Sequence, residues 1–152
     1  MNDDIKIITT NRKAFRDYHI LEKIEAGIEL VGSEVKSLRE GRANLKDSYG
    51  TLRGNEIFLV GMHIGAYSHT GYTAHEPYRD RKLLLHRREI RKFQRLVKEK
   101  NQTIIPLKLY FKKGLAKVVI ASAKGKREYD KKEAIAERDR KRDVERELKG
   151  RR

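Results

Sequence analysis

The chain contains no cysteine, which excludes disulfide bonds and thiolate metal sites. It has no apolar run near the roughly 20 residues that a membrane-spanning helix needs, so we expect nothing to cross a bilayer. Its first residues, Met1 to Asp4, lack the basic and then apolar order of a signal peptide. Together these absences favour a cytoplasmic location.

Negative charge is scarce, because 22 Asp and Glu residues stand against 37 Lys and Arg residues. The formal net charge is +15 over 152 residues, a length that suits one domain with some excess. So large an imbalance says more about partners than about fold. The partners that it favours are polyanions, namely nucleic acid or an anionic membrane surface.

Apolar residues are unevenly spread, and their distribution divides the chain into three parts. Most lie between Ile20 and Val119, whereas the segment after residue 129 has only Ile135, Val144 and Leu148 as large apolar residues. A segment so poor in apolar side chains cannot offset the entropy that it loses on ordering. We expect a flexible N-terminus over residues 1–10, a folded body over residues 11–129 and a charged tail over residues 130–152.

Period-two alternation of apolar residues predicts antiparallel strands in the body. Over residues 20–30 one face is apolar and the other is mostly polar, as in a half-buried strand. Two hairpins follow, one over residues 49–64 with its turn at Gly54 and one over residues 107–120 with its turn at Gly114.

Helical signals predict three helices, over residues 11–18, 33–41 and 86–100. Residues 68–81 are polar and contain Gly and Pro, so we expect a loop there. About six short strands are too few for a sandwich and favour a small closed barrel. The predicted fold is therefore mainly β: a six-stranded antiparallel OB-like barrel with about three flanking helices and a basic C-terminal tail.

Basic residues gather at two places in the body. The predicted helix over residues 86–100 carries a run of them away from its apolar stripe: Arg87, Arg88, Arg91, Lys92, Arg95 and Lys98. An ordinary solvated face explains that run as well as a binding surface does. The cluster Lys124-Gly125-Lys126-Arg127 is more specific, because glycine lets the backbone approach a phosphate. A charged turn is the alternative there.

The tail has a helical order of charge. On a helical wheel one sector holds Lys131, Ile135, Arg138, Arg142, Arg146 and Lys149. Most of the acidic residues lie on the other side. The arginines of this sector repel one another at a spacing of four residues, whereas a row of phosphates would attract them. Our hypothesis is a tail that is disordered when free and helical on RNA. The alternative is a plain solubilising tail.

No arrangement of residues predicts catalysis or a metal site. His63, His69 and His75 are evenly spaced by six, which no zinc motif uses, so loop histidines are the better interpretation. Ser33 and Ser37 have no neighbouring histidine in the sequence, and there is no Gly-rich phosphate loop. Recognition of a folded RNA by its shape fits better than base stacking, since tryptophan is absent. We therefore expect a non-enzymatic RNA-binding protein without cofactor or metal.

Several short motifs occur together in the order found in one known family. They are Asn11-Arg12-Lys13-Ala14, Glu25-Ala26-Gly27-Ile28, Gly32-Ser33-Glu34-Val35-Lys36-Ser37-Leu38-Arg39, Asn44-Leu45-Lys46-Asp47-Ser48-Tyr49, Arg81-Lys82-Leu83-Leu84-Leu85-His86, Lys124-Gly125-Lys126 and Asp130-Lys131-Lys132. Over about residues 11–140 the chain closely resembles the SmpB family, the SsrA-binding proteins of bacterial trans-translation.

The resemblance implies a six-stranded barrel that grips the tRNA-like domain of transfer-messenger RNA near its elbow and stands in for the missing anticodon half. It also implies a tail that enters the empty messenger channel of a stalled small subunit, near the decoding centre, and folds into a helix there. Elongation factor Tu would be a partner through the charged RNA, and the protein would act as a monomer.

The resemblance also implies which residues of the body face RNA: Asn11, Glu25, Arg39, Leu84 and Lys117, to which the basic cluster adds Lys124 and Lys126. Arg39 and Lys117 would bind phosphate. Asn11 and Glu25 would form hydrogen bonds with sugar or base edges, or would orient a neighbouring arginine. Leu84 would contact an unstacked base, although core packing is the better interpretation of this leucine without the family.

The implied ribosome contacts of the tail are Gly125, Lys126, Asp130, Lys131, Lys132 and Leu148, to which the charge pattern adds Arg138, Arg142 and Arg146. Lys132 stands where the family usually has arginine, and lysine lacks the bidentate fork of that residue. Ala74 stands where the family usually has asparagine, which leaves His75 without an implied role.

Two other functions fit the same composition. One is a ribosomal-protein-like component of the small subunit, with the tail as an anchor in ribosomal RNA. The other is an RNA-processing nuclease built on a barrel. A rescue factor would be substoichiometric to ribosomes and bound to one small RNA, whereas a subunit component would follow all ribosomes. Incubation of the pure protein with RNA and Mg²⁺ tests the nuclease.

Overall fold

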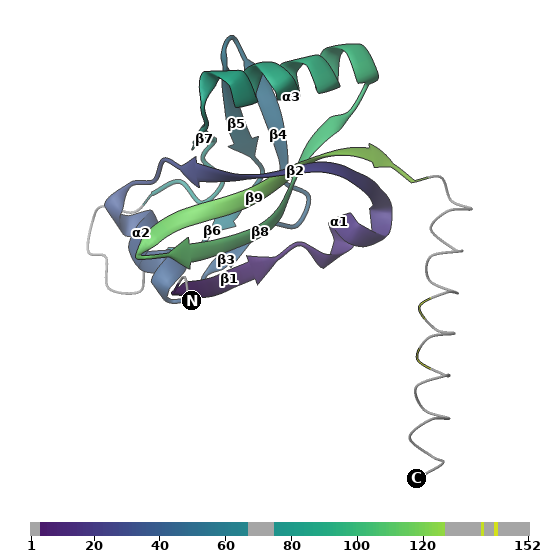
Figure 1. Cartoon of the computed structure of the whole chain (residues 1–152). Helices are drawn as coiled ribbons and strands as arrows, with labels where there is room; N and C mark the ends of the chain where they lie inside the picture. Colours follow the sequence, from purple (N-terminus) through teal and green to yellow (C-terminus); the bar gives the residue numbers. More distant parts are fainter. Residues whose placement is uncertain (1–3, 67–74, 127–137, 139–141, 143–152) are drawn as a thin grey trace.

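Six antiparallel strands close into a barrel (Figure 1). The computed structural model describes residues 4–66 and 75–126, together with Arg138 and Arg142. Around the ring the order is β8-β4-β5-β7-β2-β9, and pairing of β8 with β9 closes it. The strands are β2 (Tyr18–Ile28), β4 (Tyr49–Arg53), β5 (Glu56–Val60), β7 (Arg81–Leu84), β8 (Thr103–Lys112) and β9 (Leu115–Gly125). The predicted six-stranded barrel is confirmed.

Both predicted hairpins are present. The turn between β4 and β5 places Gly54 at φ +61°, and the turn between β8 and β9 places Lys113 at +52° and Gly114 at +79°. Positive φ at these positions matches the right-handed twist of the flanking strands, and glycine adopts it without steric cost. The long strand β2 pairs with β9 along most of its length, with a bulge between Ile20 and Lys23.

The N-terminal segment differs from the expectation of a flexible stretch over residues 1–10. Ile5–Thr10 forms strand β1, which pairs with β8 on the outside of the ring. The segment is rich in isoleucine and threonine, which favour strands, and the free edge of β8 satisfies its backbone groups. A second small sheet joins β3 (Ala43–Asn44) to β6 (His63–Ile64).

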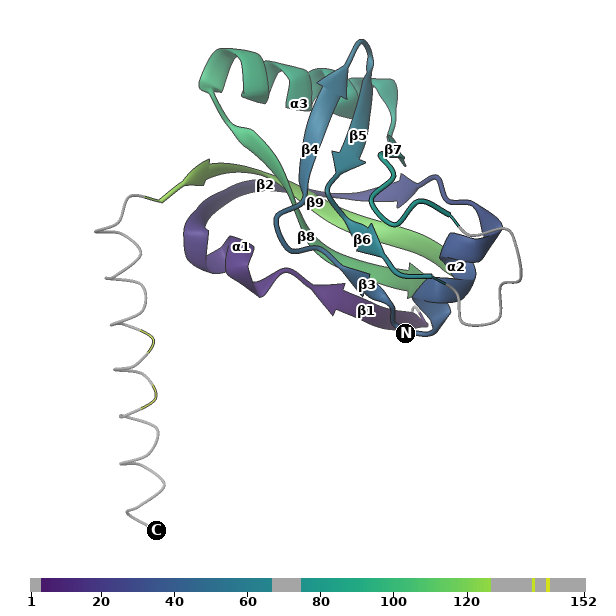
Figure 2. The same cartoon turned by 180° about the vertical axis from the view of Figure 1, so that it is seen from behind.

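Three helices flank the barrel, as predicted. They are α1 (Arg12–Asp17), α2 (Gly32–Arg39) and α3 (Arg87–Lys100). Figures 1 and 2 place α3 across one end of the barrel, beside the β4–β5 hairpin. Phe93 anchors this helix in the core, where its side chain is 1% exposed. Within the described residues no helix is both long and apolar enough to span a membrane.

A buried ion pair fixes β7 to α2. Glu34 and Arg81 are both fully buried, and the Arg81 Nε lies 2.5 Å from the Glu34 carboxylate. Arg79 lies 2.6 Å from the same carboxylate, and Arg81 also donates to the carbonyl oxygen of Met62. Burial alone would raise the pKa of Glu34, but the hydrogen bonds from Arg79, from the Val31 backbone and from Arg81 lower it overall. The strand that carries Leu84 is therefore held rigidly.

Candidate nucleic-acid interface

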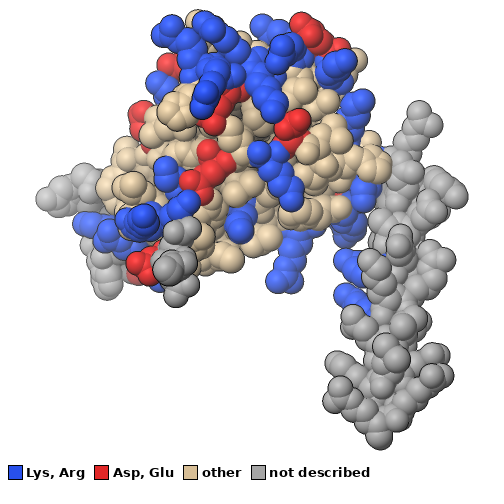
Figure 3. Space-filling model, viewed as in Figure 1, with Lys and Arg blue, Asp and Glu red and all other residues tan. Residues whose placement is uncertain are grey.

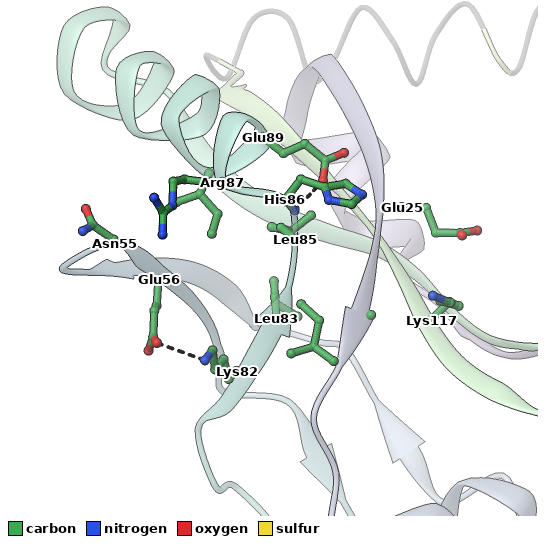
Figure 4. A pocket seen from close by; sticks show the side chains of 13 residues that line it. Glu25, Asn55, Glu56, Lys82, Leu83, Leu85, His86, Arg87, Glu89 and Lys117 are labelled. Carbon is green, nitrogen blue, oxygen red and sulfur yellow. Dashed lines mark hydrogen bonds and ion pairs between the residues drawn. The ribbon is translucent and has the colours of Figure 1, made fainter.

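A groove of about 800 Å³ opens between β2, β7, the β4–β5 turn and the start of α3. Glu25, Leu84 and Lys117 line it, so the structure brings together three of the five RNA-facing residues that the resemblance implies. In the close-up of Figure 4, Glu25 and Lys117 lie on one side of the β2 ribbon, and Asn55 and Lys82 lie on the other.

Leu84 is one of the exposed apolar residues of the groove. Its side chain is 50% exposed, whereas the neighbouring Leu83 is 1% exposed and belongs to the core. Core packing, which the sequence alone favours for Leu84, is therefore wrong. Gly27 pairs with Leu84 across the β2–β7 ladder, and a Cβ atom at Gly27 would lie 3.2 Å from the Cβ atom of Leu84. The glycine leaves the leucine room to rest against the strand.

Lys117 extends this pairing into a row across three strands. Gly27 of β2 pairs with Leu84 of β7 on one side and with Lys117 of β9 on the other. Directly paired residues project from the same face of a sheet. The groove therefore combines a cation and an exposed apolar side chain on one outer face of the barrel, separated by a glycine.

Glu25 is held by hydrogen bonding. The hydroxyl of Tyr110 donates to its carboxylate, and the Lys112 Nζ lies 3.6 Å from the same oxygen. The pKa of Glu25 is lowered, chiefly because Tyr110 stabilises the charged form, with further help from Lys112 and Lys117. Burial, followed by the bond to Glu25, raises the pKa of Tyr110. Glu25 is thus an oriented, ionised hydrogen-bond acceptor amid lysines.

Asn11 and Arg39 do not line the groove. Asn11 is 8% exposed and caps α1, accepting a hydrogen bond from the Ala14 N–H and donating one from Nδ2 to the Pro106 carbonyl oxygen. Arg39 is exposed at the last position of α2. The structure gives Asn11 a function in holding α1 to β8 that requires no RNA.

Lys124 and Gly125 form the end of β9 and pair with β2, so the alternative of a charged turn is wrong for them. The Lys126 N–H donates to the Asp17 carbonyl oxygen at 2.8 Å, which ties the start of the tail to α1. This basic cluster therefore lies beside α1, at a different place from the groove.

Most tail residues singled out by the sequence lie outside the described part of the chain: Asp130, Lys131, Lys132, Arg146 and Leu148. Arg138 and Arg142 are described, and both have helical backbone and exposed side chains. Ala74 and His69 also fall outside the described residues.

His75 and His63 have structural surroundings. The Nδ1 of His75 lies 2.9 Å from Ser33 Oγ, and its Nε2 lies 2.9 Å from the Ile64 carbonyl oxygen. His63 belongs to β6 rather than to a loop, and its ring lies 4.9 Å from that of Tyr78. Within residues 4–66 and 75–126 the side chains form no cluster suited to holding a metal ion.

The sequence did not assign two groove residues, Lys82 and His86, to an RNA-facing site, nor Tyr110, which lies outside the lining and holds Glu25. Lys82 forms an ion pair of 2.9 Å with Glu56 at the groove wall. His86 is the N-cap residue of α3, and its backbone N–H donates to the Glu89 side chain. Only the pairing of distant strands brings these residues together, and composition carries no signal for it.

Comparison with known proteins agrees with the fold and shows the family. The SmpB protein family model matches residues 8–150. The SsrA-binding protein of Syntrophobacter fumaroxidans is 54% identical over 147 residues, covering 97% of this chain and 91% of that protein. The SsrA-binding protein of Sulfurihydrogenibium sp. is 55% identical over 145 residues, covering 95% of each.

A chain from a solved structure that concerns tmRNA, SmpB and the bacterial ribosome superposes with a TM-score of 0.67. It is 44% identical, and the match covers 84% of this chain and 93% of that one. The barrel fold and the sequence match over nearly the whole length lead to one conclusion: this chain belongs to the SmpB family.

Proposed function

We propose that this chain is a non-catalytic RNA-binding factor of trans-translation, which binds the tRNA-like domain of transfer-messenger RNA and delivers it to stalled ribosomes. The observation that carries the proposal is the groove in which Glu25, Leu84 and Lys117 meet, in a chain 54% identical to an SsrA-binding protein over almost its full length.

The groove offers one contact of each kind that an exposed nucleotide needs. Lys117 supplies positive charge for a phosphate. Leu84 presents an apolar surface to the face of an unstacked base. Glu25 is an acceptor for an N–H or a ribose hydroxyl, and Tyr110 fixes its direction. Because a carboxylate repels phosphate, its presence here favours recognition of a particular base or sugar over general attraction.

The tail would act on the ribosome. In a helix its arginines at positions 138, 142 and 146 would lie on one side, and most of its acidic residues would lie on the other. Such a helix suits the messenger channel, whose walls are ribosomal RNA. We infer that the tail becomes helical in the empty channel, near the decoding centre, while the barrel holds the transfer-messenger RNA. Elongation factor Tu would reach the complex through the charged RNA, and the protein would act as a monomer in the cytoplasm.

Sequencing of the RNA that co-purifies with the protein from its host tests the first part. We expect one small RNA, in amounts well below those of ribosomes. Recovery of this chain in equal amounts with all small subunits would instead support the ribosomal-protein-like alternative.

Truncation after Tyr129 tests the division between body and tail. The shortened protein should keep its affinity for the RNA and lose tagging of stalled products. Loss of RNA binding on truncation would contradict the separate roles of barrel and tail.

A further inference from the structure

A second hollow lies beside the groove, between α3 and β2. It has a volume of about 390 Å³, and Lys23, Arg88, Lys92 and Arg95 contribute four cations to its lining. Two carboxylates, those of Glu22 and Glu89, also line it, so the lining has a net charge of +2. Figure 3 shows the same excess, with Lys and Arg gathered over α3 at the top of the molecule.

The cations of this hollow differ in whether they have an ion-pair partner. Lys92 forms an ion pair of 3.1 Å with Glu22. Arg88 and Arg95 are exposed, and within the described residues neither has an ion pair or a hydrogen bond from its side chain. They lie seven residues apart, two helical turns, and so project from the same side of α3. Two arginines facing one hollow without a carboxylate partner have free donors for an anion.

Like charges along α3 also oppose one another. Arg87 and Arg91, Arg91 and Arg95, and Arg88 and Lys92 are each four residues apart, a spacing at which equal charges destabilise a helix. A helix face that contacts only water gains nothing from like charges at this spacing. A row of phosphates would turn the repulsion into attraction, which favours a binding surface over the solvated face.

The hollow is continuous with the groove. Glu89 lines both, and Arg87 lines the groove at the first position of α3. A strand whose base meets Leu84 and whose phosphate meets Lys117 can therefore continue along α3 past Arg88 and Arg95. The rise between these two arginines is about 10 Å, which reaches more than one phosphate of that strand.

We propose that the hollow between α3 and β2 is a phosphate-binding site for the RNA strand that continues from the groove. The inference rests on the proposed RNA binding and assigns the two sites different tasks. The groove selects the RNA through base and sugar contacts, and the hollow adds affinity that does not depend on sequence.

The test compares two double variants of equal charge in the full-length protein. Arg88→Gln with Arg95→Gln removes the two arginines of the hollow that lack a carboxylate partner, and glutamine keeps the helix propensity of arginine. The control, Lys6→Gln with Lys113→Gln, removes the same charge from β1 and the β8–β9 turn, outside both sites. Affinity for a tRNA-shaped RNA and for a random duplex of equal length is measured as a function of salt. Thermal melting confirms that both variants are folded.

We expect the arginine variant to lose on the order of tenfold in affinity for both RNAs at 0.1 M salt, with a salt slope smaller by about two. Its preference for the tRNA-shaped RNA should remain. The control should lose much less affinity and keep its slope. Equal losses in the two double variants would overturn the inference, because net charge alone would then explain the effect. Absence of any preference in the unmodified protein would instead contradict the proposed function.

Discussion

The hydroxyl of Tyr110 on β8 donates a hydrogen bond to the carboxylate of Glu25 on β2, across the intervening strand β9. The two residues are 85 positions apart in the chain, and the tyrosine is 4% exposed while the carboxylate reaches the surface of the groove. A buried phenol thus fixes an acid at the edge of a basic surface. The bond favours ionised Glu25 and the protonated form of Tyr110.

Tyr110→Phe should therefore raise the pKa of Glu25 toward its ordinary value and weaken selective RNA binding. Removal of the hydroxyl eliminates the largest influence that lowers this pKa, so protonation of Glu25 begins at a higher pH. NMR titration of the Glu25 carboxyl group measures the shift directly. Affinity for a tRNA-shaped RNA, divided by affinity for a random duplex, should fall several-fold.

Tyr49→Phe is the control for this change. Tyr49 is 45% exposed on β4 and does not line the groove, so its hydroxyl should affect neither the titration nor the selectivity. An unchanged pKa of Glu25 in Tyr110→Phe would contradict the positioning role, even if the RNA affinity fell.

Leu84→Ala should reduce affinity for the tRNA-shaped RNA by about tenfold, equivalent to about 1.4 kcal/mol. Stability should change little, since the side chain is half exposed. Leu83→Ala is the opposite case, because that side chain is buried and its loss should destabilise the fold by about 2–5 kcal/mol. Filter binding and urea unfolding separate the two effects.

Leu115→Ala removes another exposed leucine, which belongs to β9 but does not line the groove, and should leave binding unchanged. Gly27→Ala should weaken binding by less than Leu84→Ala, since its new Cβ atom displaces Leu84 by only a few tenths of an ångström. Equal effects of Leu115→Ala and Leu84→Ala on affinity would show that general surface hydrophobicity, and not this groove, is being measured.

The sequence predicted the elements whose signals are local. Alternation along β2 and the glycine turns of both hairpins depend on neighbouring residues, so these features could be inferred without the structure. The sequence did not predict strand β7, because Leu83, Leu84 and Leu85 are consecutive and do not alternate with polar residues. Strand β1 was missed because its formation depends on the free edge of β8.

The site was less predictable than the fold, for a physical reason. Contact between Glu25 and Tyr110 follows from the register of three strands, which no short stretch of sequence encodes. Exposure of Leu84 depends on the same register, since a shift by one residue would bury it and expose Leu83. The family resemblance indicated Glu25, Leu84 and Lys117 in the groove, but the tyrosine that orients Glu25 required the structure.

Glu34→Gln should lower the free energy of unfolding by about 3 kcal/mol or more, because it leaves Arg81 as a buried charge without its anion. Glu56→Gln is the exposed counterpart. Its ion pair with Lys82 is exposed to solvent, and the loss of this pair should destabilise the protein far less than Glu34→Gln does. Urea unfolding at pH 7 compares the two variants.

The same ion pair should make stability depend on pH. The folded-state pKa of Glu34 is lowered, so its contribution is complete above the unfolded pKa of about 4.3 and disappears as the pH falls through the lowered value. The stability difference between Glu34→Gln and the unmodified protein should therefore shrink in acid. A difference that stayed constant from pH 7 to pH 3 would contradict a charged Glu34 in the folded protein.

Variants of Asn11 distinguish a structural role of this residue from direct contact with RNA. Asn11→Ala removes both the cap of α1 and the donor to the Pro106 carbonyl oxygen, and it should destabilise the protein by about 2 kcal/mol. Asn11→Ser restores a capping oxygen but does not reach Pro106, so its stability should be intermediate. At a temperature where all three proteins are folded, we expect their RNA affinities to agree within about twofold, since the asparagine lies outside the groove. A tenfold loss of affinity in Asn11→Ser, without unfolding, would mean that Asn11 contacts RNA and that the RNA surface extends from the groove to α1.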